Sequence, residues 1–440
     1  METYDGAWVD EHVAQTVEVW HDSAAGSMRN ARQFSASEQE TREQAYDEAL
    51  HAVERDLKRA AKSKRERMEL QTRTVASFAK FAAGALDLDG DAITLLTHEF
   101  LPVGTRLAQW SRRFDPGLAM GDIIQAARNA WTACGLQPLL GEGIKLTPAI
   151  LGYSLLYPYS DNHIDDEAVS PATKLQFSQR FRCRLLGERL LAAGDRERAI
   201  WALIALIETQ YARTRFPQVY DCLLAIHHAQ ERSISQLHNG HGGSDGESLR
   251  LSCAKGGTSV LADACLAHGS LSKQESRFAF EWGVLLQLGD DLQDVRDDMR
   301  RGSMTLFSRA VADGKALDGL TAQLLNFSEK VGDRMEGLPY GTATLKQLLR
   351  MSWRSLVIRA VADSHEFFSS GFLREAEQCS PFRYDFLRAR SDRLASRHGL
   401  YANLFEAFLE AEPDDHQGLP NDWPVCPLAS DTDGAAIWSR

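Results

Sequence analysis

Apolar residues recur about every 3.6 positions in nearly every segment between chain breakers from about residue 93 onward. No segment alternates apolar and polar residues as a half-buried strand would. A period of this length gathers the apolar side chains of a helix on one face, which must be buried against other helices. The breakers contain Pro or Gly, as in Asp115-Pro116-Gly117, and leave short connections. The sequence therefore predicts an all-α fold, a single large antiparallel bundle of many helices.

The expected helices follow the periodic segments. They span residues 121–134, 148–157, 171–193, 197–213, 219–237, 249–266, 273–299, 321–335, 344–368 and 384–409. The charged segment 35–71 predicts one further helix, which we expect within a solvent-facing N-terminal flank of residues 1–92. Residues 93–410 would form the main helical domain, and the proline-containing residues 411–440 an extended tail.

Charge and cysteine usage narrow the possible partners. The net charge of -12 disfavours nucleic acid, because binding to its phosphates requires clustered Lys and Arg. The seven cysteines are scattered and never form Cys-x-x-Cys, so we expect neither a zinc site nor a disulfide framework, and a reducing, cytoplasmic setting. The N-terminus lacks the basic and apolar regions of an export signal, and no apolar run is long enough to span a bilayer.

Three aspartates end a predicted buried helix. Asp290, Asp291 and Asp294 follow the apolar run of residues 278–285. Spacings of three and four residues bring all three carboxylates onto one helical patch, where they repel one another. A divalent cation would compensate this repulsion, and Mg²⁺ binds through a few carboxylates together with substrate phosphates. The alternative interpretation is a solvated acidic face or a helix-capping cluster.

A second acidic group follows another apolar stretch. Asp161 and Asp165 again stand four residues apart, and Asp166 is adjacent. Pro158 lies inside this pattern and is expected to kink or restart the helix. If the segment is considered alone, Ser160 or Asp161 could simply cap a helix.

These residues resemble the class I isoprenoid synthases, a family that includes prenyl diphosphate synthases, squalene and phytoene synthases, and class I terpene cyclases. The resemblance covers roughly residues 145 to 310. The second aspartate motif of the family is matched by Asp290-Asp-Leu-Gln-Asp294, with Gln287 one turn earlier. Its basic-Gly-x-x-Thr stretch is matched by Arg301-Gly-Ser-Met-Thr305, and its Lys-Thr element by Lys255-Gly-Gly-Thr258. The segment from Asp161 to Asp166 resembles the first aspartate motif only loosely.

The resemblance implies a helical bundle around a central cavity in which an allylic prenyl diphosphate, of farnesyl or geranylgeranyl size, ionises to a carbocation. It implies several Mg²⁺ ions, for which Mn²⁺ could substitute. Asp161, Asp165, Asp290 and Asp294 would be catalytic. The metal ligands would be Asp161, Asp165, Asp166, Asp290, Asp291 and Asp294, and the diphosphate would be held by Lys255, Arg301 and Arg180. From its own context, Arg180 fits a solvated or salt-bridged role as well.

Departures from the family decide between sub-families. The Gly-Lys-x-x-Arg-Pro element that binds a second diphosphate in elongating enzymes is missing, so we expect a one-substrate terpene synthase, with prenyl transfer as the runner-up. A homodimer is implied by resemblance.

Two other classes of protein remain open. A non-catalytic helical scaffold would point its aspartates to solvent and would not need Mg²⁺, and a helical phosphohydrolase would carry histidines beside the aspartates, where only His163 qualifies.

Overall fold

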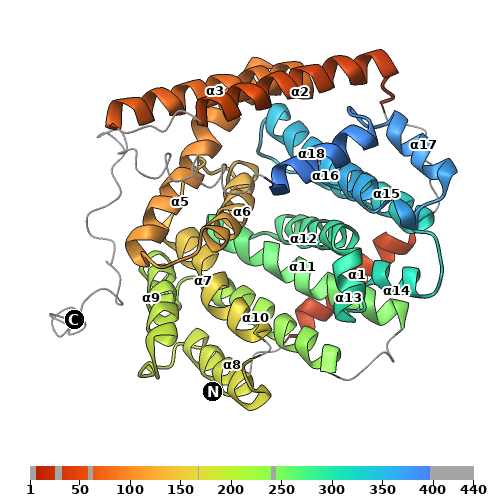
Figure 1. Cartoon of the computed structure of the whole chain (residues 1–440). Coiled ribbons are helices and arrows are strands. Elements are labelled where there is room, and N and C mark those ends of the chain that lie inside the picture. Colours follow the sequence, from red (N-terminus) through yellow and green to blue (C-terminus); the bar gives the residue numbers. More distant parts are fainter. Residues whose placement is uncertain (1–5, 25–31, 58–62, 167, 239–243, 397–440) are drawn as a thin grey trace.

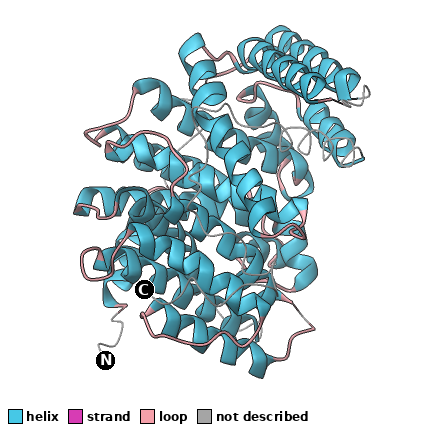
Figure 2. Cartoon of the chain, turned by 90° about the vertical axis from the view of Figure 1, so that its left-hand side faces the viewer, coloured by secondary structure: helices cyan, strands magenta, loops and turns pink. Residues whose placement is uncertain are grey.

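The computed structural model of the chain describes residues 6–24, 32–57, 63–166, 168–238 and 244–396. Every regular element in these ranges is a helix, as Figure 2 shows, which confirms the all-α expectation. The helices in chain order are α1 (Ala7–His21), α2 (Ala36–Leu57), α3 (Lys64–Leu86), α4 (Gly90–Thr94), α5 (Leu101–Phe114), α6 (Met120–Leu136), α7 (Pro148–Asp165), α8 (Pro171–Leu185), α9 (Asp195–Gln210), α10 (Pro217–His238), α11 (Asp245–His268), α12 (Lys273–Gln293), α13 (Val295–Arg301), α14 (Leu306–Ala312), α15 (Asp318–Glu336), α16 (Ala343–Asp363), α17 (Ser370–Gln378) and α18 (Tyr384–Ser396).

Helices α11 and α12 form the centre of the bundle and pack antiparallel along most of their length (Figure 1). Two glycines allow their backbones to come unusually close. A Cβ atom at Gly256 would lie 2.5 Å from the carbonyl oxygen of Gly283, and one at Gly283 would meet both the Gly256 carbonyl and the Val260 side chain. Only hydrogen fits at these positions, so the glycines of the Lys255-Gly-Gly-Thr258 segment set the spacing of the central helix pair.

The N-terminal segments pack against the C-terminal half of the chain. Helix α1 lies against α11, α12 and α15, where Trp20 meets Phe327 edge to face. Helices α2 and α3 run side by side across one end of the bundle (Figure 1). Buried carboxylates of α2 bind arginines at and near α18, as in the pair of Glu54 with Arg393. Part of the expected solvent-facing flank is therefore held by ion pairs to residues more than three hundred positions away.

Several helix boundaries differ from the prediction. The expected helix 35–71 is two helices, because Ser63 starts α3 with a reciprocal capping box to Glu66. The expected helix 171–193 ends at Leu185, followed by Gly187 in the left-handed region. The expected helix 273–299 is interrupted at Asp294, which separates α12 from α13. The predicted tail, residues 411–440, and the end of the expected helix 384–409 lie outside the described residues.

None of the described helices is both long enough and apolar enough to cross a membrane.

Candidate functional site

Asp290, Asp291 and Asp294, which we call the Asp290 group, lie at the C-terminal end of α12. The Asp294 amide donates to the carbonyl of Asp290, and the Asp298 amide to that of Asp294, so helical spacing continues through the break into α13. The carbonyl end of a helix carries partial negative charge and favours cations. The last turn of α12 contains aspartates and no basic residue. This is an arrangement that a bound cation would stabilise.

Asp291 is the buried member of the group, with 5% of its surface exposed. Its two carboxylate oxygens accept hydrogen bonds from Ser252 Oγ at 2.7 Å and from Gln287 Nε2 at 2.8 Å. Ser252 comes from α11, so the close approach at Gly256 and Gly283 also places this donor. Asp291 is therefore held in one orientation by neutral donors.

The structure adds Asp298 to the group, a residue that the sequence analysis did not select. Its carboxylate lies close enough to Asp291 and Asp294 for both to raise its pKa, and the Thr305 side chain hydrogen-bonds it. Gly302, with a φ of 71°, turns the chain after α13 and brings Thr305 back toward it. The spacing of four residues from Asp294 was the signal in the sequence that could have found it.

Burial makes the ionised form of these carboxylates unfavourable. Burial, followed by the neighbouring Asp291 and Asp294, raises the pKa of Asp290 to about 6. Burial and the same two neighbours raise the pKa of Asp298 to about 6 as well. The pKa values of Asp291 and Asp294 are also raised, mainly by burial. Ionisation of any of these four neighbouring acids thus lowers the stability of the folded protein, unless a cation binds beside them.

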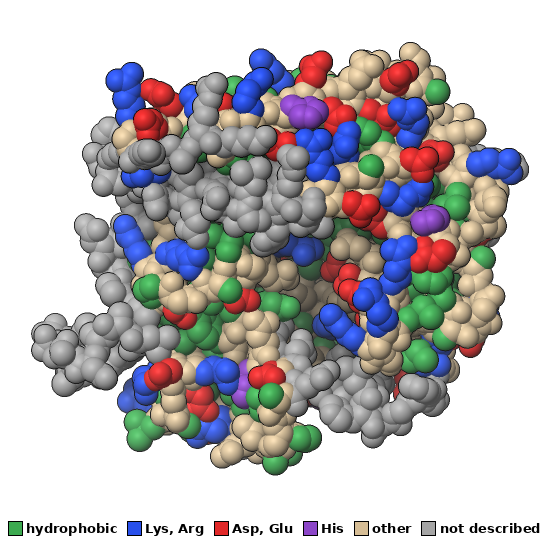
Figure 3. Space-filling view, viewed as in Figure 1, with side chains coloured by type: hydrophobic (Ala, Val, Ile, Leu, Met, Phe, Trp, Pro, Cys, Tyr) green, Lys and Arg blue, Asp and Glu red, His purple; other side chains and the backbone are tan. Residues whose placement is uncertain are grey.

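Three basic side chains face this group without carboxylate partners of their own in the described part of the chain. Lys255 of α11 lowers the pKa of Asp290 and Asp291, and Arg301 lowers that of Asp294 and Asp298. Arg128 of α6 lowers the pKa of Asp290 and Asp294, and its guanidinium donates a long hydrogen bond, of 3.4 Å, to the side-chain oxygen of Gln125. Figure 3 shows acidic and basic side chains close together around a hollow in the region of α12 and α13.

Arg128 could not be assigned from the sequence. It stands on α6, more than one hundred and fifty residues before the aspartates, and its signal in the sequence is only that Arg128 and Asn129 are polar residues on an otherwise apolar helix, which fits a cavity lining or an internal pair equally. The structure brings it to them because α6 packs against α11 and α7. At the next residue, Asn129, Nδ2 donates to Asp263 of α11 at 3.2 Å and to Ser154 of α7 at 3.3 Å, which fixes the three helices relative to one another.

The first aspartate group occupies the end of α7. This helix continues through Pro158, and the Ser160 hydroxyl donates to the carbonyl of Leu156, so neither Ser160 nor Asp161 caps a helix. The side chains of Asp161 and Asp165 lie outside the described residues. Asp166 is exposed and accepts the amide of Ala168.

The backbone of α7 nevertheless places this group relative to the rest of the bundle. Asn162 Nδ2 donates to Asp122 of α6 at 3.0 Å, two turns before Arg128. His163 is buried against Phe177 and accepts a bond from Arg196. Helical spacing puts positions 161 and 165 on the opposite face of α7 from His163. The end of α7 thus adjoins α6, the helix whose Arg128 lowers the pKa of Asp290 and Asp294.

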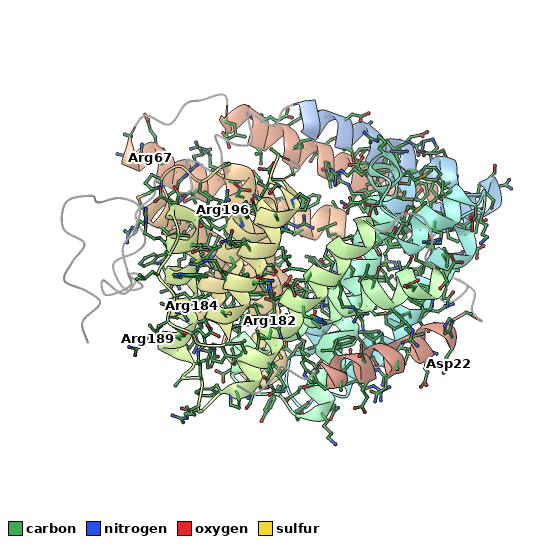
Figure 4. The ribbon with its side chains drawn as sticks, turned by 90° about the horizontal axis from the view of Figure 1, so that it is seen from below. Asp22, Arg67, Arg182, Arg184, Arg189 and Arg196 are labelled. Atoms are coloured by element: carbon green, nitrogen blue, oxygen red, sulfur yellow. The ribbon has the colours of Figure 1, made fainter. Side chains whose placement is uncertain are left out.

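The remaining basic candidate, Arg180, is occupied elsewhere. Its guanidinium binds both oxygens of Glu197 at 2.7 Å and the carbonyl of Leu191 at 2.6 Å. Figure 4 shows neighbouring arginines of the same region, Arg184 and Arg196, on one side of the molecule. The structure does not bring Arg180 to the Asp290 group, and a role on the diphosphate stays a prediction that requires this ion pair to open.

The apolar cavity and the metal site also stay predictions. The aromatic side chains at the centre, such as Phe278 and Phe280, are fully packed, and a Cβ at Gly257 would collide with the Phe280 ring. One pocket lies along α3, and a small one lies between α15, α16 and α17. Among the described residues, no group of three or more His, Cys, Asp or Glu side chains is placed so that it could hold a metal ion.

The raised pKa values predict how the group responds to Mg²⁺ and to pH. If this group binds Mg²⁺, protons should compete with the ion for Asp290 and Asp298, because the pKa values of these residues are raised to about 6. The increase in melting temperature that Mg²⁺ produces should therefore be large at about pH 7.5 and nearly absent at about pH 5, where these acids hold protons. Thermal unfolding with Mg²⁺, compared with Na⁺ at equal ionic strength, measures it. An equal Mg²⁺ effect at both pH values would contradict the assignment.

Comparisons with protein-family models, with curated proteins and with solved structures gave no match to this chain.

Proposed function

We propose that this protein is a Mg²⁺-dependent class I terpene synthase that ionises an allylic prenyl diphosphate of farnesyl or geranylgeranyl size. One observation carries the proposal. Four acids with raised pKa values adjoin three basic side chains, Lys255, Arg301 and Arg128, that have no carboxylate partner in the described part of the chain. A metal diphosphate would supply an opposite charge to both sets of side chains, because the carboxylates would coordinate the metal ion and the basic side chains would bind the phosphate oxygens.

The residues fit the chemistry of oxygen-loving cations. Asp290 and Asp294 offer carboxylate oxygens at the edge of the group, while Asp291 is positioned by Ser252 and Gln287. Asp161, Asp165 and Asp166 would complete the site from α7. When bound, Mg²⁺ neutralises charge that grows on the departing diphosphate. Lys255, Arg301 and Arg128 would bind the same phosphate oxygens. This would disfavour recombination of the released diphosphate with the allylic carbocation.

The described residues favour this function over the two other classes. A scaffold that uses an acidic face for docking would expose its aspartates, whereas Asp291 is buried and Asp290 is partly buried. A phosphohydrolase with two metals needs histidines beside the aspartates. His163 instead points away from positions 161 and 165, into a contact with Phe177 and Arg196.

A turnover assay tests the proposal. Purified protein is given geranyl, farnesyl or geranylgeranyl diphosphate singly, then each with isopentenyl diphosphate, with Mg²⁺ or with EDTA. Diphosphate release and extractable products are followed. Metal-dependent release from a single substrate is the expected result. Activity only with isopentenyl diphosphate would assign the chain to prenyl transfer, and no metal-dependent release in any combination would contradict the catalytic function.

Adjacent arginines provide a matched test of diphosphate binding. Arg301 lowers the pKa of Asp294 and Asp298, whereas Arg300 is exposed and forms an ion pair with Asp297 at 2.5 Å. We expect Arg301→Gln to weaken binding of Mg²⁺ diphosphate on the order of tenfold to a hundredfold, since a charge-assisted bond to phosphate is lost. Arg300→Gln should change it less than about threefold. Titration calorimetry measures both, and equal affinities for the two variants would exclude Arg301 from the site.

A further inference from the structure

The connection between α8 and α9 exposes apolar side chains. Residues 186–194 include four leucines and alanines in succession, Leu190-Leu-Ala-Ala193, and 92% of the Leu191 side chain is exposed to solvent. Leu186 is also exposed. Exposing a leucine to water is unfavourable, so a fully exposed one in an ordered loop calls for a physical explanation.

Partly buried ion pairs hold this loop in place at both ends. Arg180, paired with Glu197, donates to the carbonyl of Leu191, and Glu197 accepts the amide of Ala193 at 2.7 Å. At the start of the loop, Arg213 donates to the carbonyls of Leu185 and Arg184 while it pairs with Glu208. The backbone at Leu191 and on either side of it is therefore anchored where the side chain is exposed.

The surroundings of the loop are basic in an otherwise acidic protein. Residues 171–198 contain seven Lys and Arg against three Asp and Glu, whereas the whole chain carries a net charge of -12. Arg189 lies within the loop and is exposed, and no carboxylate partner is recorded for it in the described part of the chain. Figure 4 shows Arg184, Arg189 and Arg196 on this side of the molecule, far from Asp22.

We infer that the loop of residues 186–194 docks on an anionic lipid bilayer. Leucines that enter the interface, next to arginines that meet anionic headgroups, are the combination that binds a membrane surface without spanning it. A second copy of the chain is disfavoured as the occupant, because a symmetric contact would bring two basic loops together. The inference rests on the loop alone and is independent of the proposed catalytic activity.

Vesicle flotation tests this docking surface with the full chain, without Mg²⁺ or prenyl diphosphate. The probes are vesicles of phosphatidylcholine, with and without phosphatidylglycerol. We expect the protein to float with the anionic vesicles at low salt, and much less with neutral vesicles or at high salt. Leu191→Asp should lower the bound fraction about tenfold, and Arg189→Glu by a similar factor.

Met68→Asp is the matched control. Met68 is 55% exposed on α3, away from α8 and α9, so the variant makes the same change of charge and apolarity at another site. It should bind anionic vesicles as the wild type does. The inference is overturned if the wild type does not float at low salt, if Leu191→Asp binds as well as Met68→Asp, or if Leu191→Asp alters only the oligomeric state measured by light scattering.

Discussion

Asp290→Asn should make the metal-free protein more stable and at the same time abolish the diphosphate-ionising activity that we propose. Burial raises the pKa of Asp290 from 3.8 to about 6, so the ionised carboxylate is unfavourable in the folded state at neutral pH. A shift of this size corresponds to roughly 1–3 kcal/mol once screening by its neighbours is allowed for. The amide keeps the shape and removes the charge. Turnover should fall on the order of a hundredfold to a thousandfold, because a ligand of the reacting diphosphate complex is lost.

The sign of the pH dependence follows from linkage. Because the folded pKa of Asp290 lies above the unfolded value, its contribution to stability is fully present below about pH 4 and is lost as the pH rises through about 6. The stability gained by Asp290→Asn should therefore be small at about pH 4 and reach its full size above about pH 7. Urea unfolding of the metal-free protein at several pH values measures this difference.

Asp297→Asn is the control for this experiment. Asp297 lies in the same segment but pairs with Arg300 on the surface of α13. Its replacement should change the free energy of unfolding by less than about 0.5 kcal/mol and leave turnover nearly unchanged. If Asp290→Asn instead destabilises the metal-free protein, the Asp290 group is a structural network, and the proposed metal site loses its main support.

Gly283→Ala should strongly destabilise the protein, although alanine favours helices by about 1 kcal/mol over glycine. The added methyl group would collide with the carbonyl of Gly256 and lie 2.9 Å from the Val260 Cβ, so α11 and α12 must separate. Overpacking of this kind costs roughly 1–3 kcal/mol or more. Separation also moves Ser252 and Lys255 away from Asp291, so the stabilisation by Mg²⁺ and diphosphate should be lost as well.

Helical glycines with free space around them are the matched controls. No atom lies within 4 Å of a Cβ added at Gly121 of α6 or at Gly319 of α15. Alanine at either position should leave stability unchanged or raise it by up to about 1 kcal/mol. Urea midpoints and far-ultraviolet circular dichroism compare the three variants. A Gly283→Ala protein as stable as the controls would show that the two central helices do not depend on the glycine contact.

The helical class and the Asp290 group could be predicted from the sequence because both depend on neighbours along the chain. A period of 3.6 residues is enough to predict amphipathic helices, and spacings of three and four residues place Asp290, Asp291 and Asp294 together on any helix. The family resemblance pointed to Lys255 and Arg301 through short motifs. The helix ends were predicted less well, since caps such as Ser63 and turns such as Gly187 depend on a few atoms each.

Contacts between distant segments required the tertiary structure. Arg128 meets the aspartates only because α6 packs on α11, and Arg180 turns from them because Glu197 lies across the next loop. Likewise, the two glycines beside Lys255 interrupt a motif in the sequence, yet in the fold they are the reason α11 can bring Ser252 to Asp291. Spacing along the chain determines which side chains share a helix face, whereas the packing of helices determines which charged side chains of different helices come together.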